Sequence, residues 1–191
     1  MICRSYWSNG GQLTNKGLEF SANAKVLTLR NLSWELGASV GHYINEITAL
    51  PADIYSERPL VNGGYTTSVY NGEVLSAVGN PAGVFYGYKT AGVFATREQA
   101  EQADLKIMNN DGSYSSFGAG DVIFEEVADA NGVKDHIINE QDKQIIGNPN
   151  PDFYGTITNK ITYKNISLSA LFTYSYGNDV YNYQRSQLES G

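Results

Sequence analysis

Residues 166–176 read Ile-Ser-Leu-Ser-Ala-Leu-Phe-Thr-Tyr-Ser-Tyr, and apolar and polar side chains alternate along them. Leu171 is the one residue that breaks the alternation. The apolar members are Ile166, Leu168, Ala170, Phe172, Tyr174 and Tyr176, and the polar members are Ser167, Ser169, Thr173 and Ser175. A period of two is that of a β-strand, whose successive side chains point to opposite faces. A long strand that is aromatic on one face and polar on the other suits a wall between lipid and water.

The stretch Ile146-Gly-Asn-Pro-Asn-Pro-Asp-Phe153 leads into this region of the chain. Each proline fixes its own φ and pushes the preceding residue out of the helical region, so we expect residues 148–151 to be extended. A hairpin at about 153–178 follows, with a short turn at Lys164–Asn165.

A second hairpin is expected at about 16–46, where the same alternation occurs. Its apolar positions are Leu18, Phe20, Ala22, Ala24 and Val26, then Trp34, Leu36, Ala38 and Val40 after a tight connection around residues 28–32. Residues 47–152 between the hairpins are rich in Gly, Asn, Asp and Tyr. Short turns at one end and long loops at the other are the topology of an outer-membrane barrel. We therefore predict a mainly β fold of antiparallel, long-stranded hairpins from a transmembrane β-barrel, which this chain cannot close alone.

Two local elements are expected within the long connection. Val84–Tyr88 has the composition of a short aromatic strand. Residues 96–103 form the best helical segment, since Thr96 can cap the helix and Gln99 stands at the third helical position, as in a capping box.

Four blocks of sequence resemble, in the same order, motifs of the SusC/RagA-type TonB-dependent outer-membrane transporters of the Bacteroidetes. The blocks are Asn15-Lys-Gly-Leu-Glu-Phe20; Gly79-Asn-Pro-Ala-Gly-Val-Phe-Tyr-Gly-Tyr-Lys89; Gly120-Asp-Val-Ile-Phe124 with Asp142-Lys-Gln-Ile-Ile-Gly-Asn-Pro-Asn-Pro151; and Gly177-Asn-Asp-Val-Tyr181. One family motif, Asp-Gly-Ile-Phe, reads Ala91-Gly-Val-Phe94 here. The resemblance covers most of residues 15–182.

The resemblance implies a place in the cell outer membrane and a role in TonB-dependent uptake of glycan or peptide oligomers. It also implies a SusD-like surface lipoprotein as partner, and contact with the TonB complex through parts absent here. No signal peptide, plug or further barrel strands are visible, so we expect a fragment from the C-terminal part of the barrel. In that frame the two short turns face the periplasm, and residues 47–152 form a long extracellular loop region.

Other classes of function receive less support from the sequence. The net charge of −7 leaves no basic patch to neutralise phosphates, so we expect no nucleic-acid partner. The two histidines, His42 and His136, stand outside any nucleophile motif, so we predict that the chain is not an enzyme. The alternative that stays open is a surface-exposed β-domain that acts as a binding or structural module.

The acidic stretch 129–142 is the candidate for a calcium loop, and two frames fit it in part. One frame places Asn131, Asp135, Asn139 and Asp142 at ligand positions 1, 5, 9 and 12. The other takes Glu140 as position 12, with Asp129 and Asn131 at positions 1 and 3. Each frame lacks one ligand and the turn glycine, so a solvated acidic loop is the alternative, and we expect no other cofactor.

Tyr86 and Tyr88 are the candidate ligand-binding residues. Tyrosine offers an apolar face to a sugar ring or a peptide side chain, and a hydroxyl at its edge. The alternative is that these rings pack the loop, because an alternating strand buries at least one face.

Overall fold

The computed structural model describes residues 10–51, 64–69 and 72–189. The chain divides into two compact units. The first comprises the residues up to Thr67 together with 75–84 and those from Gly147 onward; the second comprises 68–74 and 85–146. No helix in the described part of the chain is both long and apolar enough to cross a membrane.

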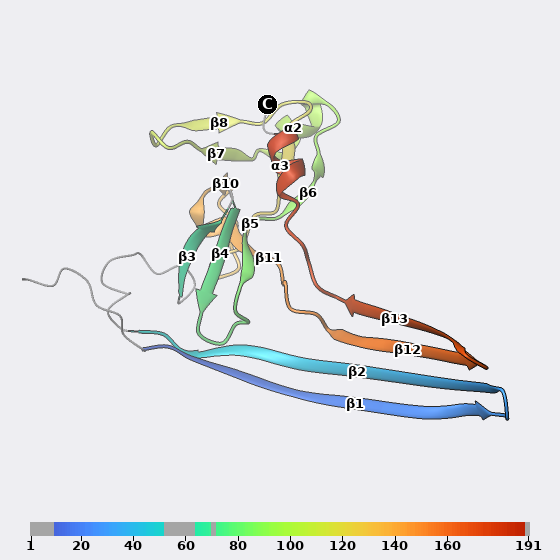
Figure 1. Cartoon of the computed structure of the whole chain (residues 1–191). Coiled ribbons are helices and arrows are strands. Elements are labelled where there is room, and N and C mark those ends of the chain that lie inside the picture. Colours follow the sequence, from blue (N-terminus) through green and yellow to red (C-terminus); the bar gives the residue numbers. More distant parts are fainter. Residues whose placement is uncertain (1–9, 52–63, 70–71, 190–191) are drawn as a thin grey trace, which may run out of the picture. The chain divides into compact units, whose positions relative to one another are not determined.

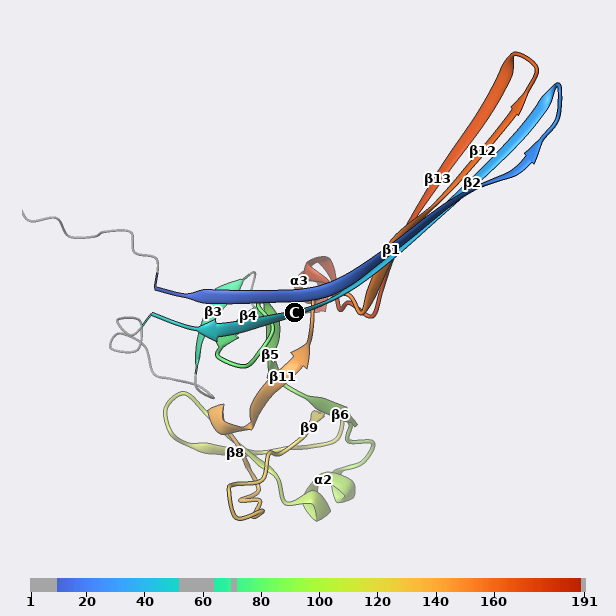
Figure 2. The ribbon, with the colours of Figure 1, turned by 90° about the horizontal axis from the view of Figure 1, so that it is seen from below.

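Four long antiparallel strands form the main sheet of the first unit, in the order β1-β2-β12-β13. They are β1 (Gln12–Thr28), β2 (Leu32–Ala49), β12 (Phe153–Tyr163) and β13 (Ile166–Tyr176). Figures 1 and 2 show them side by side. The predicted hairpins are both present, and β2 pairs directly with β12 although residues 50–152 separate them. The sheet does not close on itself, which confirms the predicted fold class.

The strand register sorts the side chains of this sheet, which we call the wall, into two faces. Leu36 faces Ala24 and Asn159 across the neighbouring strands, and Asn159 faces Ala170. The remaining apolar positions lie in register with these, as the alternation predicted. Val26 is the exception, because a register shift between Lys25 and Leu27 places Leu27 opposite Trp34. Such a bulge inserts one residue and ends the simple alternation of β1.

The two hairpin turns lie at the same end of the wall. In the first, the backbone N–H of Leu29 donates to the carbonyl of Leu32 at 2.7 Å, which leaves Arg30–Asn31 as the turn residues. In the second, Lys164 has a positive φ of 51°. The N–H of Lys164 donates to the carbonyl of Asn31 at 2.8 Å, so a backbone hydrogen bond joins the two turns.

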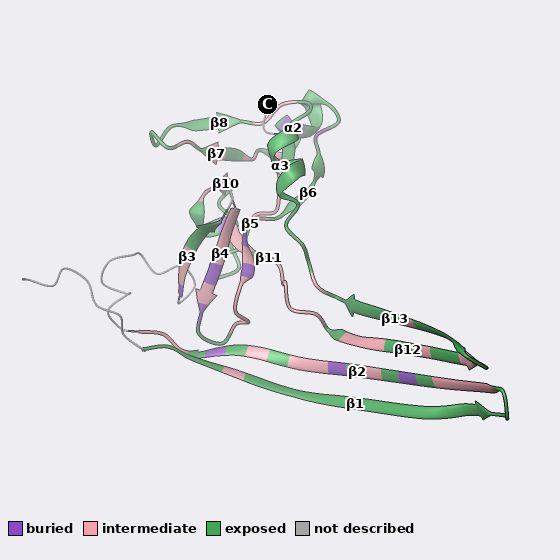
Figure 3. Cartoon of the chain, viewed as in Figure 1, coloured by how far each residue is buried: buried purple, intermediate pink, exposed green. Residues whose placement is uncertain are grey.

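Another four-stranded sheet has the order β11-β5-β4-β3. Its strands are β3 (Gly64–Val69), β4 (Gly72–Ala77), β5 (Val84–Tyr88) and β11 (Lys143–Gly147). The strand predicted at 84–88 is thus present as β5. Leu75, Ala77, Val84 and Tyr86 are buried here, whereas β1 of the wall is exposed along nearly its whole length (Figure 3).

The remaining elements are short. They are β6 (Thr90–Val93), α2 (Arg97–Ala103), β7 (Lys106–Met108), β8 (Tyr114–Ser116), β9 (Val122–Phe124), β10 (Ile137–Ile138), the 3-10 turn η1 (Glu140–Asp142) and α3 (Tyr183–Glu189). The predicted cap of α2 is confirmed, since Thr96 Oγ1 accepts from the backbone N–H of Gln99 at 3.2 Å. The Gln99 side chain accepts in return from the N–H of Ala95 at 2.8 Å.

Candidate functional site

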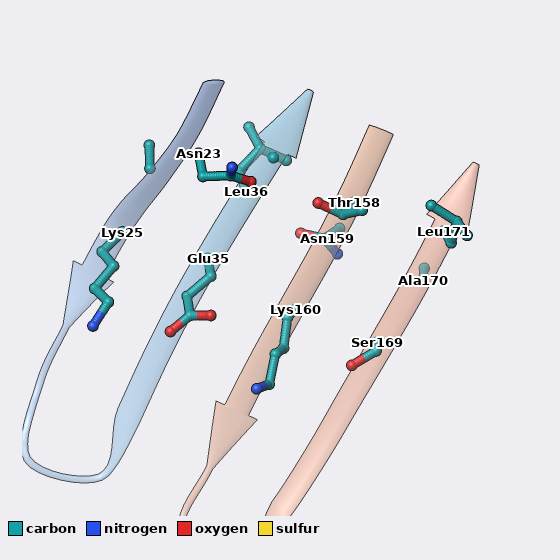
Figure 4. Close-up of a pocket in the computed structure, with 12 residues that line it drawn as sticks. Asn23, Lys25, Glu35, Leu36, Thr158, Asn159, Lys160, Ser169, Ala170 and Leu171 are labelled. Atoms are coloured by element: carbon teal, nitrogen blue, oxygen red, sulfur yellow. The ribbon is translucent and has the colours of Figure 1, made fainter. Parts of the chain in front are cut away.

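The polar face of the wall carries a shallow groove. Gly37 is one of its lining residues, and a Cβ at this position would collide with Asn23 Oδ1 and Thr158 Oγ1. Glycine therefore provides the space into which these two polar side chains point. The polar side chains of Asn23, Lys25, Glu35, Thr158, Lys160 and Ser169 line the groove together with apolar ones such as Leu171, and the four strands lie beneath them (Figure 4).

Charged residues form one row across the groove. The register places Glu35 between Lys25 on β1 and Lys160 on β12, with Ser169 next on β13. Figure 4 shows these four side chains from four successive strands. Leu171, which broke the alternation in the sequence, lies on this polar face in the next row and is 64% exposed.

Hydrogen bonds continue along the polar face away from the turns. Ser39 Oγ and Thr156 Oγ1 are 2.7 Å apart. Tyr154 donates from Oη to the Glu19 carboxylate, and its ring fills the space that a side chain at Gly41 would take. A surface of hydroxyl, amide and charged groups can exchange hydrogen bonds with water and with a hydrated solute.

The opposite face of the wall is an exposed apolar band. Its large members include Leu18, Phe20, Leu36, Val40, Ile157, Ile161, Leu168 and Phe172, which are 37–83% exposed. The one amide in the middle of the band, that of Asn159, accepts a hydrogen bond from Trp34 Nε1 at 2.7 Å. Aromatic residues lie toward both ends of the band, Trp34 and Tyr163 near the turns and Phe153, Tyr174 and Tyr176 at the far end.

Three of the sequence blocks meet in the first unit, in what we call the asparagine cluster: Asn45, Asn148, Asn150 and Asp179. Asn150 Nδ2 donates to the carbonyl of Ala82 at 3.1 Å and to Asn148 Oδ1 at 2.8 Å. Asn45 Oδ1 accepts from the N–H of Ala82 at 2.7 Å. The cluster thus binds the loop 79–83 to both β2 and the segment 148–151.

Asp179 ties the third block to the same place. Its carboxylate accepts from the N–H of Asn148 at 2.8 Å, and its own N–H donates to the Asn148 carbonyl at 2.8 Å. His42 Nδ1 lies 2.6 Å from the carbonyl of Asp152, and the His42 ring lies 5.4 Å from that of Phe153. His42 is therefore held as a residue of the wall.

Lys143 is the best-buried cation of the second unit's ion pairs. Its side chain is 12% exposed, and Nζ lies 3.2 Å from Glu73, 2.8 Å from Glu140 and 5.5 Å from the ring centre of Tyr88. Burial disfavours the charge, but the hydrogen bonds to Glu140 and Glu73 outweigh this and raise the pKa of Lys143. The sequence offered no pattern that singled out this lysine.

The two tyrosines proposed as ligand contacts lie beside this ion pair. Tyr86 is 3% exposed, so its ring is part of the core of the sheet. Tyr88 is half-buried, with its ring 5.6 Å from that of Phe124. Burial raises the pKa of both hydroxyls. These positions favour a packing role over an open binding face, and ligand binding by the pair stays a prediction.

The carboxylates of the acidic loop accept hydrogen bonds from nearby backbone N–H groups. Asp142 is buried, and its two oxygens accept from the N–H groups of Val127 at 2.9 Å and Asn139 at 2.8 Å. Asp135 accepts from the N–H of Ile137, and Asn139 from that of Gln141. Asn131 instead contacts Asp129, whose carboxylate accepts two backbone N–H bonds.

The observed geometry does not suit calcium, because the oxygens that would bind the ion already accept hydrogen bonds from backbone N–H groups. Among the described residues, no three His, Cys, Asp or Glu side chains gather as a metal site. The calcium loop stays a prediction that would require Asp135, Asn139 and Asp142 to turn away from these backbone donors.

No protein-family model matches the chain. It is 28% identical to a TonB-dependent receptor of Formosa agariphila over 96% of the chain and 17% of that receptor. It is 29% identical to the TonB-dependent receptor SusC of Bacteroides thetaiotaomicron over 91% of the chain and 15% of SusC. The chain therefore spans about a sixth of the length of these relatives.

Among solved structures, the RagAB peptide transporter shares the fold. The TM-score is 0.57 at 19% identity, over 91% of this chain and 16% of the RagAB chain. The same transporter in its closed state gives a TM-score of 0.58 at 18% identity. Sequence likeness along nearly the whole chain and the shared fold agree with the four sequence blocks and the open, two-faced wall. The chain is a segment of a TonB-dependent receptor of the SusC/RagA type.

Proposed function

We propose that this segment supplies wall strands and external loops to an outer-membrane importer that takes up oligomeric nutrients, glycans or otherwise peptides. The observation that carries the proposal is the two-faced wall, apolar on one side and polar and grooved on the other. Lipid would cover the apolar band, and the polar face would line the water-filled side.

The dimensions of the wall support this placement. The eleven residues of β12 rise about 3.4 Å each, roughly 34 Å from Phe153 to Tyr163. Strands of such barrels tilt by about 40°, which reduces this length to roughly 26 Å across the membrane. That height matches the apolar band of about 25 Å that aromatic girdles flank in outer-membrane barrels.

The orientation and the partners follow from the same proposal. The turns at Arg30–Asn31 and Lys164–Asn165 would face the periplasm, and the residues of the second unit would be extracellular. A SusD-like lipoprotein would cover the extracellular mouth, and parts of the receptor outside this segment would reach the TonB complex. Similarity to the TonB-dependent receptor SusC and to the RagAB peptide transporter supports uptake in this general sense.

Epitope tags in the full-length receptor test the orientation. We expect antibody on intact cells to label a tag at Asn110, in the β7–β8 turn, and to miss a tag at Asn165. Labelling at Asn165 alone would reverse the orientation.

Growth tests the transport role. We expect deletion of the receptor gene to abolish growth on one class of glycan or peptide as sole nutrient. Unchanged growth on all of them, together with loss of surface adhesion, would instead support a binding or structural module.

A further inference from the structure

The second unit contains a cavity that shares no lining residue with the wall groove or the asparagine cluster. Its lining residues are Asp104, Lys106, Tyr114, Asp135, His136 and Ile137. Five of these six side chains carry a group that can donate or accept hydrogen bonds. The sixth, Ile137, adds apolar surface.

The small sheet of order β10-β7-β8 sets the floor of the cavity. Lys106 stands in register with Ile137 on one side and Ser116 on the other, while Met108 stands opposite Tyr114. Residues in register share a face, so the side chains of Lys106, Tyr114 and Ile137 lie together. Ile138 belongs to the opposite face and is fully buried, which fixes the sheet to the body of the unit.

Two residues with a left-handed backbone line the cavity, and one of them, Asp104, is the C-cap of α2. Only three non-glycine residues of the described ranges have a positive φ, and two of them, Asp104 at 49° and His136 at 60°, line this cavity. The His136 carbonyl accepts from the N–H of Lys106 at 2.9 Å, and its N–H donates to the Glu126 carboxylate. Residues held in sparsely populated conformations concentrate at binding sites, where the surrounding bonds keep a side chain in place.

The chemistry of the lining selects one class of ligand. Tyr114 is 56% exposed, so one face of its ring is open to a partner. Asp104 and Asp135 disfavour an anion, and Lys106 offsets part of their attraction for a cation. A neutral ring with several hydroxyl groups meets no such opposition, because it can donate to the carboxylates, accept from the ammonium and place its C–H face on the aromatic ring.

We propose that this cavity binds one unit of a neutral saccharide. The sugar ring lies against Tyr114, and its hydroxyls bond to Asp104 and Asp135. The inference rests on the proposed function, in which these residues are extracellular and meet the nutrient before it enters the barrel. It adds a contact site that is separate from Tyr86 and Tyr88.

Binding of the purified full-length receptor to a printed array of neutral oligosaccharides and uncharged peptides tests the proposal. We expect the wild type to bind at least one oligosaccharide, and Tyr114→Ala to weaken that binding about tenfold through loss of the stacking surface. Tyr114→Phe keeps the ring and should stay within about threefold of the wild type. Ser116→Ala, on the same strand and face but outside the cavity, is the matched control and should bind like the wild type.

The proposal is overturned if no oligosaccharide binds, or if Tyr114→Ala binds as well as Ser116→Ala does. Because Tyr114 is largely exposed, its replacement should leave the unit folded, and amide exchange of β7 and β8 verifies this. Growth separates the two claims. A receptor that binds only peptides and supports growth on them is an importer without this saccharide site, whereas one that supports growth on neither class contradicts the proposed function itself.

Discussion

The side chain of Asn150 reaches across from the segment 148–151 and donates from Nδ2 to the backbone carbonyl of Ala82 at 3.1 Å. Asn150 follows Pro149 and Ala82 follows Pro81, in two blocks that lie far apart in the sequence. Pro149 also lies 3.4 Å from where a Cβ on Gly83 would stand, and Gly83 has a positive φ of 81°. The repeated Asn-Pro dipeptides therefore form a joint that fixes two loops on the wall.

Replacing Asn150 tests this joint. Asn150→Ala removes the donor to Ala82 and to Asn148, so we expect loops 79–83 and 148–152 to open more readily by about 1–3 kcal/mol. Amide exchange of the full-length receptor measures this local opening. Asn110→Ala, at an exposed turn, is the control and should change little; equal effects in the two variants would show that the cluster is not a joint.

Two glycines of the wall should respond differently to alanine. A Cβ at Gly155 would meet the backbone carbonyl of Ser39, which cannot move without disturbing the strand pairing. A Cβ at Gly37 would meet only the ends of the Asn23 and Thr158 side chains, which can rotate. We expect Gly155→Ala to destabilise the barrel by roughly 1–3 kcal/mol and Gly37→Ala by clearly less. Urea unfolding of the receptor in detergent measures both, and the reverse order would contradict the register.

Lys143 should stabilise the β4–β5 region more than an exposed lysine does. We expect Lys143→Met to ease local opening of these strands by about 1–2 kcal/mol, since it leaves two carboxylates without their cation. Lys89→Met removes a pair whose side chains are 53% and 39% exposed, and should cost less than about 0.5 kcal/mol.

The pH dependence of the Lys143 contribution follows from its raised pKa. The stabilisation is complete below the unfolded value of 10.5 and is lost as pH rises through the higher folded value. Amide exchange compared between pH 9 and pH 11 should therefore show the wild type approaching the Lys143→Met variant. A constant difference across that range would contradict the assignment.

We expect Asp129 to keep the acidic loop ordered. This order should be lost in acid and should not require calcium. The N–H groups of Val133 and Asn131 hold the pKa of its carboxyl below the usual value. The contribution is therefore present above the unfolded value of 3.8 and lost as pH falls through the lower folded value. We expect exchange at residues 129–133 to rise at low pH, as it would in Asp129→Ala. Removing calcium with EGTA at neutral pH should leave amide exchange in the loop unchanged. Faster exchange after EGTA would support the prediction that the loop binds calcium.

Sequence reasoning succeeded where a signal is local and repeated. The alternation along residues 166–176 and 16–46 required strands with two different faces, and the cap at Thr96 required a helix start. The bulge at Lys25–Leu27 was missed because one inserted residue among apolar neighbours leaves a pattern that still reads as alternating.

Partners distant in the sequence carried no such signal. The sequence around Ser39 and Thr156 does not predict that these residues meet across β2 and β12, because the pairing depends on how the whole wall assembles. The asparagine cluster was visible only as separate blocks, although their Asn-Pro dipeptides marked the residues that bond. Lys143 and the cavity at Tyr114 had no sequence signal, because tertiary packing alone brings their neighbours together.

Spin-label accessibility along β13 shows whether the wall separates lipid from water. Nitroxides would be placed singly at Leu168, Ser169, Phe172 and Thr173 of the full-length receptor in bilayers. We expect positions 168 and 172 to be accessible to oxygen and shielded from a water-soluble nickel complex, and positions 169 and 173 to show the reverse. Equal accessibility of all four positions to the nickel complex would mean that the wall does not separate lipid from water.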